Sequence, residues 1–333
     1  MLGAEGGLEE ELVPARGYDL RLIPKAAFPR RPNVSALRFP RTLGTAISRT
    51  GRIVDEVGAE VVVGFGGYVS PPAYLAARRR RVPIVVHEGN ARAGLASRLG
   101  ARFTTHVATT FEDTTLPHAQ VVGLPLRTEI TAMDRSATRP AALAQFGLEP
   151  DRPTVLVTGG SLGARRINEA FEHSVGPLRS AGIQVLHVTG RGKEFDPGPS
   201  APGDAAYVVL PYADRMELCY AAADLVVTRA GAGMVCETGA IGLPAVFVPL
   251  PIGNGEQRLN ARGAVHAGGA LLVADEDFTP EWIRAELIPL VRDRARLERM
   301  SAAAREMGRH DADRALVAMI DRAARQTEER DGR

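Results

Sequence analysis

The stretch that decides the fold is Thr154-Val-Leu-Val-Thr-Gly-Gly-Ser-Leu-Gly-Ala164. Its first five residues are mostly β-branched and predict a buried strand, and the glycine-rich part predicts a tight turn into a helix. Glycines let backbone N–H groups approach a phosphate closely, and a helix N-terminus adds about half a positive charge. The loop has neither the dinucleotide-binding fingerprint nor the P-loop motif, so a phosphate site and a purely structural turn are both compatible with it.

Strands and helices alternate in both directions from this stretch. Ala- and Arg-rich segments such as 74–80 and 94–99 predict helices, and the chain ends on three predicted helices at 280–292, 294–308 and 311–327. Such alternation is typical of parallel sheets covered by helices. The other predicted strands are 61–65, 83–87, 105–108, 120–122, 184–188, 207–210, 225–228, 245–248 and 270–273.

The composition is that of a globular protein and argues against several functional classes. A length of 333 residues suffices for about two domains, and a linker-like stretch at 123–127 separates the two series of strands. No run approaches the ~18 apolar residues of a membrane-spanning helix, and the acidic start is unlike a secretion signal, so we expect a cytoplasmic protein. Cys219 and Cys236 are too few for a disulfide framework. Aromatic residues make up 5% and do not interleave with a basic stripe, which argues against a nucleic-acid partner.

A second loop, at 229–237, also follows a predicted strand and opens a helix. Gly231 and Gly233 leave room for a diphosphate, and Glu237, about one turn into the helix, could accept both hydroxyls of a ribose. The alternative is an ordinary exposed glutamate on a helix.

A third loop, at 253–260, follows the strand at 245–248. Gln257 and Asn260 share one helical face by their spacing, and two amides at a helix start suit sugar hydroxyls. Helix capping by Asn254 is the alternative for this segment.

The stretch Gly159-Gly-Ser-Leu-Gly-Ala164 and four others, one of which overlaps the third loop, resemble the MurG family of glycosyltransferases, and their order is kept nearly end to end. The resemblance implies an α/β GT-B fold, in which two Rossmann-like domains face each other across a cleft. It implies an inverting transfer of N-acetylglucosamine from UDP-N-acetylglucosamine (UDP-GlcNAc) to lipid I, undecaprenyl-diphosphate-MurNAc-pentapeptide, which gives the lipid II of peptidoglycan synthesis. No metal ion or cofactor is implied. The further stretches are Gly64-Phe-Gly-Gly-Tyr-Val-Ser70, His87-Glu-Gly-Asn90, Gly242-Leu-Pro244 and Gly255-Glu-Gln-Arg-Leu-Asn-Ala261.

The resemblance also implies domain bounds. Residues 1–126 would form the acceptor- and membrane-binding domain, to which a helix at 311–330 returns, and residues 127–310 would bind UDP-GlcNAc. Arg127 would lie near the nucleotide, Ser161 on the diphosphate, and the backbone of Ala213 on the uracil edge. The donor residues implied are Asn90, Arg127, Ser161, Ala213, Glu237 and Gln257, with Tyr212, Gly231, Gly233 and Asn260 as additional candidates. Those implied on the acceptor side are Gly66, Gly67, Tyr68 and Ser70.

The chain departs from the family pattern at its start. Family members begin with a strand, a Gly-Gly-Thr-Gly-Gly-His loop, a helix and a second strand, whereas this chain begins at Leu2-Gly3-Ala4. The loop carries the histidine proposed as general base, so we expect an incomplete N-terminal domain that binds UDP-GlcNAc but transfers its sugar poorly. Among the seven histidines only His87 is predicted at a strand end near the cleft. A proton-transfer role and a structural hydrogen bond are its two interpretations.

Cationic residues of the first domain predict a peripheral contact with the anionic inner leaflet of the cell membrane, on its cytoplasmic face. They are Arg38, Arg41, Arg49, Arg52 and the run 78–81, with apolar residues between the first of them. Each such cation is worth about 1 kcal/mol near an anionic surface. Scattered surface arginines on a solvated helix are the alternative.

Two other functions remain compatible with the sequence. A nonenzymatic UDP-sugar-binding remnant would explain the missing loop. A UDP-GlcNAc epimerase of the same fold would need no lipid acceptor, so turnover of UDP-GlcNAc alone would reveal it.

Overall fold

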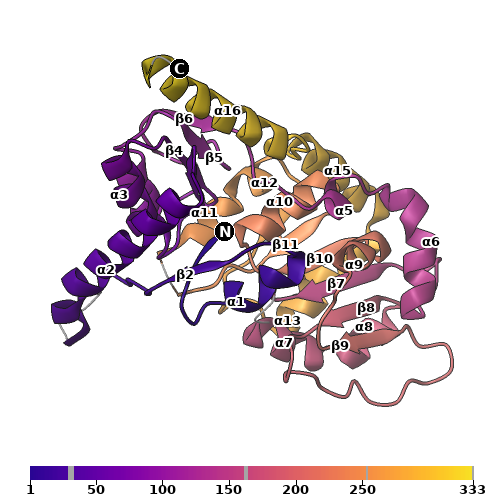
Figure 1. Cartoon of the computed structure of the whole chain (residues 1–333). Coiled ribbons are helices and arrows are strands. Elements are labelled where there is room, and N and C mark those ends of the chain that lie inside the picture. Colours follow the sequence, from indigo (N-terminus) through magenta and orange to yellow (C-terminus); the bar gives the residue numbers. More distant parts are fainter. Residues whose placement is uncertain (29–33, 161–163, 253, 332–333) are drawn as a thin grey trace. The chain divides into compact units, whose positions relative to one another are not determined.

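The computed structural model describes residues 1–28, 34–160, 164–252 and 254–331 (Figure 1). Its contacts divide the chain into two compact units, each with parallel sheets and helices. Unit 1 contains Met1–Gly123 and Asp311–Arg333, and unit 2 contains Leu124–His310. The predicted α/β class is confirmed for both units. The division after Gly123 lies three residues before the boundary predicted at 126.

Unit 1 holds two parallel sheets, and no ladder joins them among the described residues. The smaller sheet pairs β1 (Leu2–Ala4) with β2 (Arg21–Ile23). The larger sheet has the order β3-β4-β5-β6. The expected absence of a preceding strand and glycine loop stays a prediction. The strands of the larger sheet are β3 (Val62–Gly64), β4 (Ile84–Glu88), β5 (Val107–Thr109) and β6 (Ala119–Val121).

Helices cover both faces of the larger sheet of unit 1. Val86 packs with Tyr74 of α3 on one face, whereas its neighbour Val85 packs with Met319 of α16 on the other. The alternation follows from the two-residue period of a strand. In Figure 1 the long α16 runs beside β4 to β6. The helical segments are α1 (Glu9–Leu12), the 3-10 turn η1 (Pro14–Arg16), α2 (Val34–Glu56), α3 (Ser70–Arg80), α4 (Leu95–Gly100) and α16 (Ala312–Asp331).

Unit 1 differs from the sequence-based expectation before its larger sheet and at α3, and none of the elements from β1 to α2 was predicted. Helix α3 starts at Ser70 rather than at the predicted 74, because Pro71 and Pro72 occupy its first turn, where a missing N–H is harmless. Strands β1 and β2 were not predicted, because each is only three residues long and Ile23 is their only β-branched residue.

Unit 2 is built on one six-stranded parallel sheet of order β12-β11-β10-β7-β8-β9. From β7 the chain moves outward through β8 and β9, then returns to pair β10 on the other side of β7 and moves outward through β11 and β12. This is the doubly wound order, and its direction reverses between β7 and β10. The strands are β7 (Thr154–Thr158), β8 (Gln184–Val188), β9 (Tyr207–Leu210), β10 (Leu225–Thr228), β11 (Ala245–Phe247) and β12 (Ala270–Leu272).

Two hydrophobic clusters hold the helices of unit 2 in place. Val155 and Val157 of β7 pack with Phe171 of α7, while Leu143 of α6 packs with Leu218 of α9. Helix α6 was not predicted and contains Pro140. The helical segments are α5 (Thr128–Thr131), α6 (Arg135–Phe146), α7 (Arg165–Glu172), α8 (Val175–Ser180), α9 (Met216–Ala222), α10 (Ala232–Ala240), α11 (Glu256–Asn260), α12 (Arg262–His266), α13 (Pro280–Trp282), the π turn η2 (Ile283–Leu287), α14 (Ile288–Arg292) and α15 (Arg294–Glu306).

The hydropathy of the helices was compared with that of membrane-spanning segments. Across the described segments, no helix combines the length and the apolar composition needed to cross a bilayer.

Candidate functional site

The candidate site of unit 2 lies where the strand order reverses. Strands β7 and β10 are paired there, with Thr158 opposite Thr228 at their carboxyl ends. Open parallel sheets bind ligands at such a point, because the loops that leave the two strands diverge. Two of the three predicted glycine-containing loops follow these two strands.

The loop after β7 is described only at its ends. Gly160 adopts a left-handed conformation, with φ of +78°, and its N–H donates to the Thr158 hydroxyl at 3.2 Å. Ala164 then caps α7 in an extended conformation. Ser161, the predicted diphosphate ligand, lies outside the described residues.

The loop after β10 presents open backbone. Gly231 caps α10, and a Cβ atom added at Gly231 or Gly233 would meet no atom within 4 Å. The buried Asn260 supports this loop, because its Nδ2 donates to the Ala230 carbonyl at 3.2 Å. Open space therefore lies beside the backbone of this loop, and Asn260 holds that backbone in place.

Glu237 lies on α10 and is held from two sides. Its Oε2 accepts a hydrogen bond from the Tyr220 hydroxyl at 2.5 Å, and its Oε1 lies 3.8 Å from Nη2 of Arg127. Only 16% of its side chain is exposed, against 46% for Arg127. Tyr220 is fully buried, and burial raises its pKa well above the usual value, so it is a neutral donor. Sequence reasoning missed Tyr220, which nothing in its local pattern distinguishes from a core residue.

The other donor candidates of unit 2 lie on different elements. Gln257 accepts from the Leu250 N–H at 2.9 Å through Oε1, which leaves its amide NH2 as the end able to reach a ligand. Tyr212 is 45% exposed and its ring lies 4.9 Å from the Arg191 guanidinium. Ala213 is half-buried beside it, between β9 and α9.

A buried ion pair lies next to the loop after β10. Arg229 bonds to Asp275 and, at 3.0 Å, to the Val248 carbonyl, and Arg166 of α7 lies 3.8 Å from the same aspartate. This cluster ties β10, β12 and α7 together, and sequence reasoning missed it. Asp275 and Asp277 have Asp-x-Asp spacing, as do Asp311 and Asp313. Within the described segments no group of three His, Cys, Asp or Glu side chains is placed to hold a metal ion.

His87 is a buried residue of unit 1 with a structural hydrogen bond. Its Nε2 donates to the Gly123 carbonyl at 2.8 Å, since a carbonyl can only accept. Its ring packs 5.4 Å from that of Phe65. Burial lowers the pKa of His87, so the ring is neutral near pH 7. The geometry corresponds to the second of the two interpretations given for this histidine.

Glu88 organises the loop that carries Asn90. Its carboxylate accepts from the N–H groups of Asn90 and Gly94, each at 2.9 Å. Thr114 donates to the Asn90 carbonyl at 3.1 Å. The backbone of Asn90 is therefore held on both sides, and its half-buried side chain also donates from Nδ2 to Glu88 Oε1 at 3.5 Å.

The acceptor-side candidates form one turn before α3. Gly66 and Gly67 have positive φ angles of 84° and 74°, a conformation that favours glycine. Ser70 is buried and its hydroxyl donates to the Gly66 carbonyl at 2.5 Å, so it supports the turn. Tyr68 is 47% exposed, with Lys25 Nζ at 5.4 Å from its ring centre.

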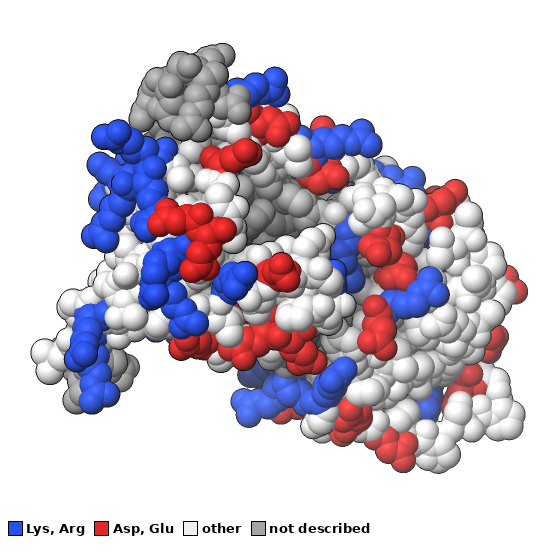
Figure 2. Space-filling model, in the orientation of Figure 1, with Lys and Arg blue, Asp and Glu red and all other residues white. Residues whose placement is uncertain are grey.

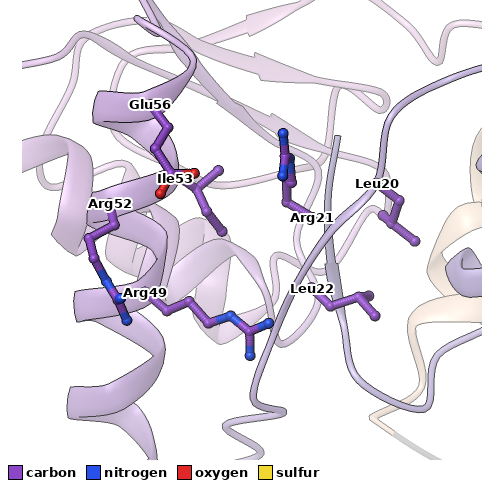
Figure 3. A pocket seen from close by; sticks show the side chains of 7 residues that line it. All are labelled: Leu20, Arg21, Leu22, Arg49, Arg52, Ile53 and Glu56. Carbon is purple, nitrogen blue, oxygen red and sulfur yellow. The ribbon is translucent and has the colours of Figure 1, made fainter.

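Part of the predicted basic surface of unit 1 is already neutralised. Figure 2 shows Lys and Arg side chains gathered over α2 and α3. Arg49 pairs with Glu5 at 2.9 Å, and Arg80 with Asp55 at 2.6 Å. Arg49 also borders a groove of about 410 Å³ between α2 and β2 (Figure 3). The residues that line this groove are Leu20, Arg21, Leu22, Arg49, Arg52, Ile53 and Glu56.

Comparison with known proteins gives the same two-part organisation. The glycosyltransferase family 28 N-terminal domain matches residues 1–109, and the family 28 C-terminal domain matches residues 154–316. Two similar relatives are named UDP-N-acetylglucosamine--N-acetylmuramyl-(pentapeptide) pyrophosphoryl-undecaprenol N-acetylglucosamine transferase. The one from Leifsonia xyli is 54% identical over 96% of this chain and 88% of its own length. The one from Streptomyces coelicolor is 51% identical, also over 96% and 88%.

Two solved structures illustrate the range of similar folds. MurG of Acinetobacter baumannii is 28% identical, has a TM-score of 0.78, and aligns over 96% of this chain and 90% of its own. UDP-GlcNAc 2-epimerase from Neisseria meningitidis bound to UDP-GlcNAc has a TM-score of 0.63 over 96% and 91% of the two chains. At 13% identity the epimerase shows a shared fold alone.

Proposed function

This chain belongs to glycosyltransferase family 28, and on that premise we propose that it transfers N-acetylglucosamine from UDP-GlcNAc to lipid I. The reaction is the one for which its relatives are named, and it gives the lipid II of peptidoglycan synthesis. The enzyme is therefore a hexosyltransferase.

The observation that carries the proposal is the pair formed by Glu237 and Arg127. The Glu237 carboxylate is largely buried, and its Oε1 lies 3.8 Å from Arg127 Nη2, which is too far for a hydrogen bond. This oxygen can therefore accept hydrogen bonds from ribose hydroxyls. The half-exposed guanidinium offers a bidentate donor for phosphate oxygens. A ligand that carries a diol and a phosphate within one nucleotide uses both.

The departing diphosphate is stabilised by donors rather than by a metal ion. The backbone at Gly231 and Gly233 opens α10, whose N-terminus favours negative charge, and Arg127 adds a full positive charge. Ser161 supplies a further hydroxyl on the loop after β7. An acceptor hydroxyl attacks the anomeric carbon from the side opposite UDP, while the bond from that carbon to the diphosphate oxygen breaks and the hydroxyl proton passes to a base. The attack inverts that centre.

The remaining contacts follow the positions of the candidate residues. In unit 2 the amide of Gln257 binds the sugar, and the backbone of Ala213 binds the uracil edge with Tyr212 as a stacking ring. The turn that contains Gly66, Gly67, Tyr68 and Ser70 binds the acceptor. His87 is not the general base in this proposal, because burial and its bond to Gly123 give its ring a structural role.

Attachment to the membrane is peripheral and electrostatic, on the cytoplasmic face. Arg38, Arg41 and Arg52 are exposed and form no ion pair among the described residues. Arg49 and Arg80 contribute less, because Glu5 and Asp55 already neutralise them. Unit 1 thus supplies a cationic surface for anionic lipid headgroups.

The test follows the donor in two steps. Calorimetry with UDP-GlcNAc measures binding, with ADP-glucose as the mismatched control, and labelled UDP-GlcNAc with lipid I in detergent measures transfer to the lipid fraction. We expect selective binding, and label in the lipid only when lipid I is present. A folded protein that does not bind UDP-GlcNAc, or that converts it without lipid I, would contradict the proposal.

A further inference from the structure

We propose that Tyr220 is a positioning residue for the donor nucleotide: its hydroxyl holds the Glu237 carboxylate away from Arg127, so that both charged groups stay available to the ligand. The inference rests on the proposed function and deepens it at the same site. It assigns a role to a fully buried side chain that touches no ligand itself.

The first step is the direction of the hydrogen bond. Tyr220 Oη lies 2.5 Å from Oε2 of Glu237 and 3.4 Å from the sulfur of Met234. A phenol has one proton, and a carboxylate is a much stronger acceptor than a thioether. The proton therefore lies on the bond to Glu237, which fixes one carboxylate oxygen at the surface of α9.

The second step concerns the gap between Glu237 and Arg127. A charge-assisted hydrogen bond joins nitrogen and oxygen at about 2.7 to 2.9 Å, whereas these atoms are 3.8 Å apart. The two groups attract each other without a direct bond. If the Tyr220 hydroxyl were removed, nothing in the described contacts of Glu237 would oppose its movement toward Arg127.

The third step is the consequence for the ligand. A direct bond between Glu237 and Arg127 would occupy the oxygen proposed for the ribose and the guanidinium proposed for the phosphates. The nucleotide would then have to break this bond before it could bind. Tyr220 keeps the pair separated in advance, which is preorganisation of the site by a buried neutral donor.

A matched control lies in the same unit. Tyr207 is also buried, and its hydroxyl lies 3.0 Å from Nδ1 of His187. Replacement of either tyrosine by phenylalanine removes one buried hydroxyl and one hydrogen bond. Only Tyr220 bonds to a residue of the proposed donor site, so a difference in nucleotide binding between the two variants isolates the positioning role.

The experiment compares Tyr220→Phe, Tyr207→Phe and Glu237→Gln by thermal melting and by calorimetry with UDP and 2′-deoxy-UDP. We expect both phenylalanine variants to melt at lower temperature, but only Tyr220→Phe to bind UDP about tenfold more weakly, the effect of about 1.4 kcal/mol. For 2′-deoxy-UDP the loss should be smaller than for UDP, since this ligand lacks one hydroxyl that Glu237 receives but keeps its 3′ hydroxyl and both phosphates. KM for UDP-GlcNAc should rise while kcat changes little.

Several outcomes would overturn the inference. They are unchanged UDP affinity in folded Tyr220→Phe, an equal loss with Tyr207→Phe, or an equal loss for both nucleotides. If Tyr220→Phe does not fold, the role of Tyr220 is tested in the unmodified protein by ¹³C NMR of its tyrosines. The protein has six tyrosines, so the spectrum contains few signals. The Tyr220 signal must then move with UDP and move less with 2′-deoxy-UDP. If the unmodified protein binds no UDP, or Glu237→Gln binds it normally, the proposed function fails instead.

Discussion

Glu88, the last residue of β4 in unit 1, and Glu237, on α10 in unit 2, are both largely buried carboxylates, but they differ in their partners. Glu88 is 5% exposed and accepts from two backbone N–H groups of its own loop. Glu237 accepts from one neutral side chain and faces an arginine that does not reach hydrogen-bond distance. The comparison teaches that a carboxylate whose oxygens both accept hydrogen bonds from its own loop stabilises that loop. A carboxylate with one oxygen free of hydrogen bonds to the neighbouring cation is instead suited to bind a ligand.

The largest effect is expected from Glu88→Ala. The substitution leaves the half-buried N–H groups of Asn90 and Gly94 without their acceptor, and each such donor that water does not reach costs about 1 to 3 kcal/mol. Chemical denaturation should therefore show a clear loss of stability. UDP affinity, measured below the melting temperature, should stay near that of the parent, because the carboxylate contacts only unit 1 residues. A marked loss of UDP affinity with intact stability would reverse the assignment of the two glutamates.

The reciprocal variant is Glu237→Ala. It removes a charge-assisted acceptor worth about 1.5 to 3 kcal/mol, which corresponds to about a ten- to hundredfold loss of UDP affinity. Stability should fall as well, because the fully buried Tyr220 hydroxyl keeps only the Met234 sulfur as a partner, and an unsatisfied buried donor costs about 1 to 3 kcal/mol. Calorimetry with UDP checks the first expectation and melting the second. Unchanged UDP affinity would remove Glu237 from the site.

His187 extends the comparison to a second fully satisfied polar group. Its Nε2 lies 3.1 Å from Oδ1 of Asn168, whose Nδ2 donates to the Thr189 carbonyl, so Nε2 carries the proton and Nδ1 accepts from Tyr207. Burial lowers the pKa of His187 to about 3, against 6.5 in the unfolded chain. The neutral ring is favoured only in the folded state.

The sign of the pH effect follows from that difference. Below about pH 6.5 His187 binds a proton in the unfolded state but stays neutral in the folded state. The free energy of unfolding therefore falls as the pH falls toward 3. By pH 5 the loss reaches about 2 kcal/mol at 1.36 kcal/mol for each pH unit. Denaturation at pH 7 and pH 5, with His187→Gln as the control that lacks the titration, measures it. A control that loses as much stability as the parent would contradict this account of the ring.

Much of the fold, and less of the site, could be predicted from the sequence. Strands β7, β8, β9 and β10 have the predicted bounds. Every residue of β7, β8 and β10 is buried, and strands buried on both faces are rich in Val, Ile and Leu, while β9 at the sheet edge is Tyr207-Val-Val-Leu210. Glu237 could be proposed from its place after a strand and a glycine turn. Tyr220 could not, because its partner lies 17 residues away and the contact depends on how α9 packs beside α10.

The smallest expected effect is a difference in vesicle binding between substitutions of two arginines on α2. Arg41 and Arg49 are both exposed on α2, but Arg49 pairs with Glu5 at 2.9 Å and Arg41 has no ion pair among the described residues. A free cation near an anionic leaflet is worth about 1 kcal/mol, or about fivefold in binding. Arg41→Gln should therefore weaken sedimentation with anionic vesicles more than Arg49→Gln does. Added salt should shrink the difference, because screening acts over about 8 Å at physiological ionic strength. Equal sedimentation of both variants and the parent at low salt would show that α2 does not face the membrane, and the charge left unpaired on it would then be an ordinary solvated one.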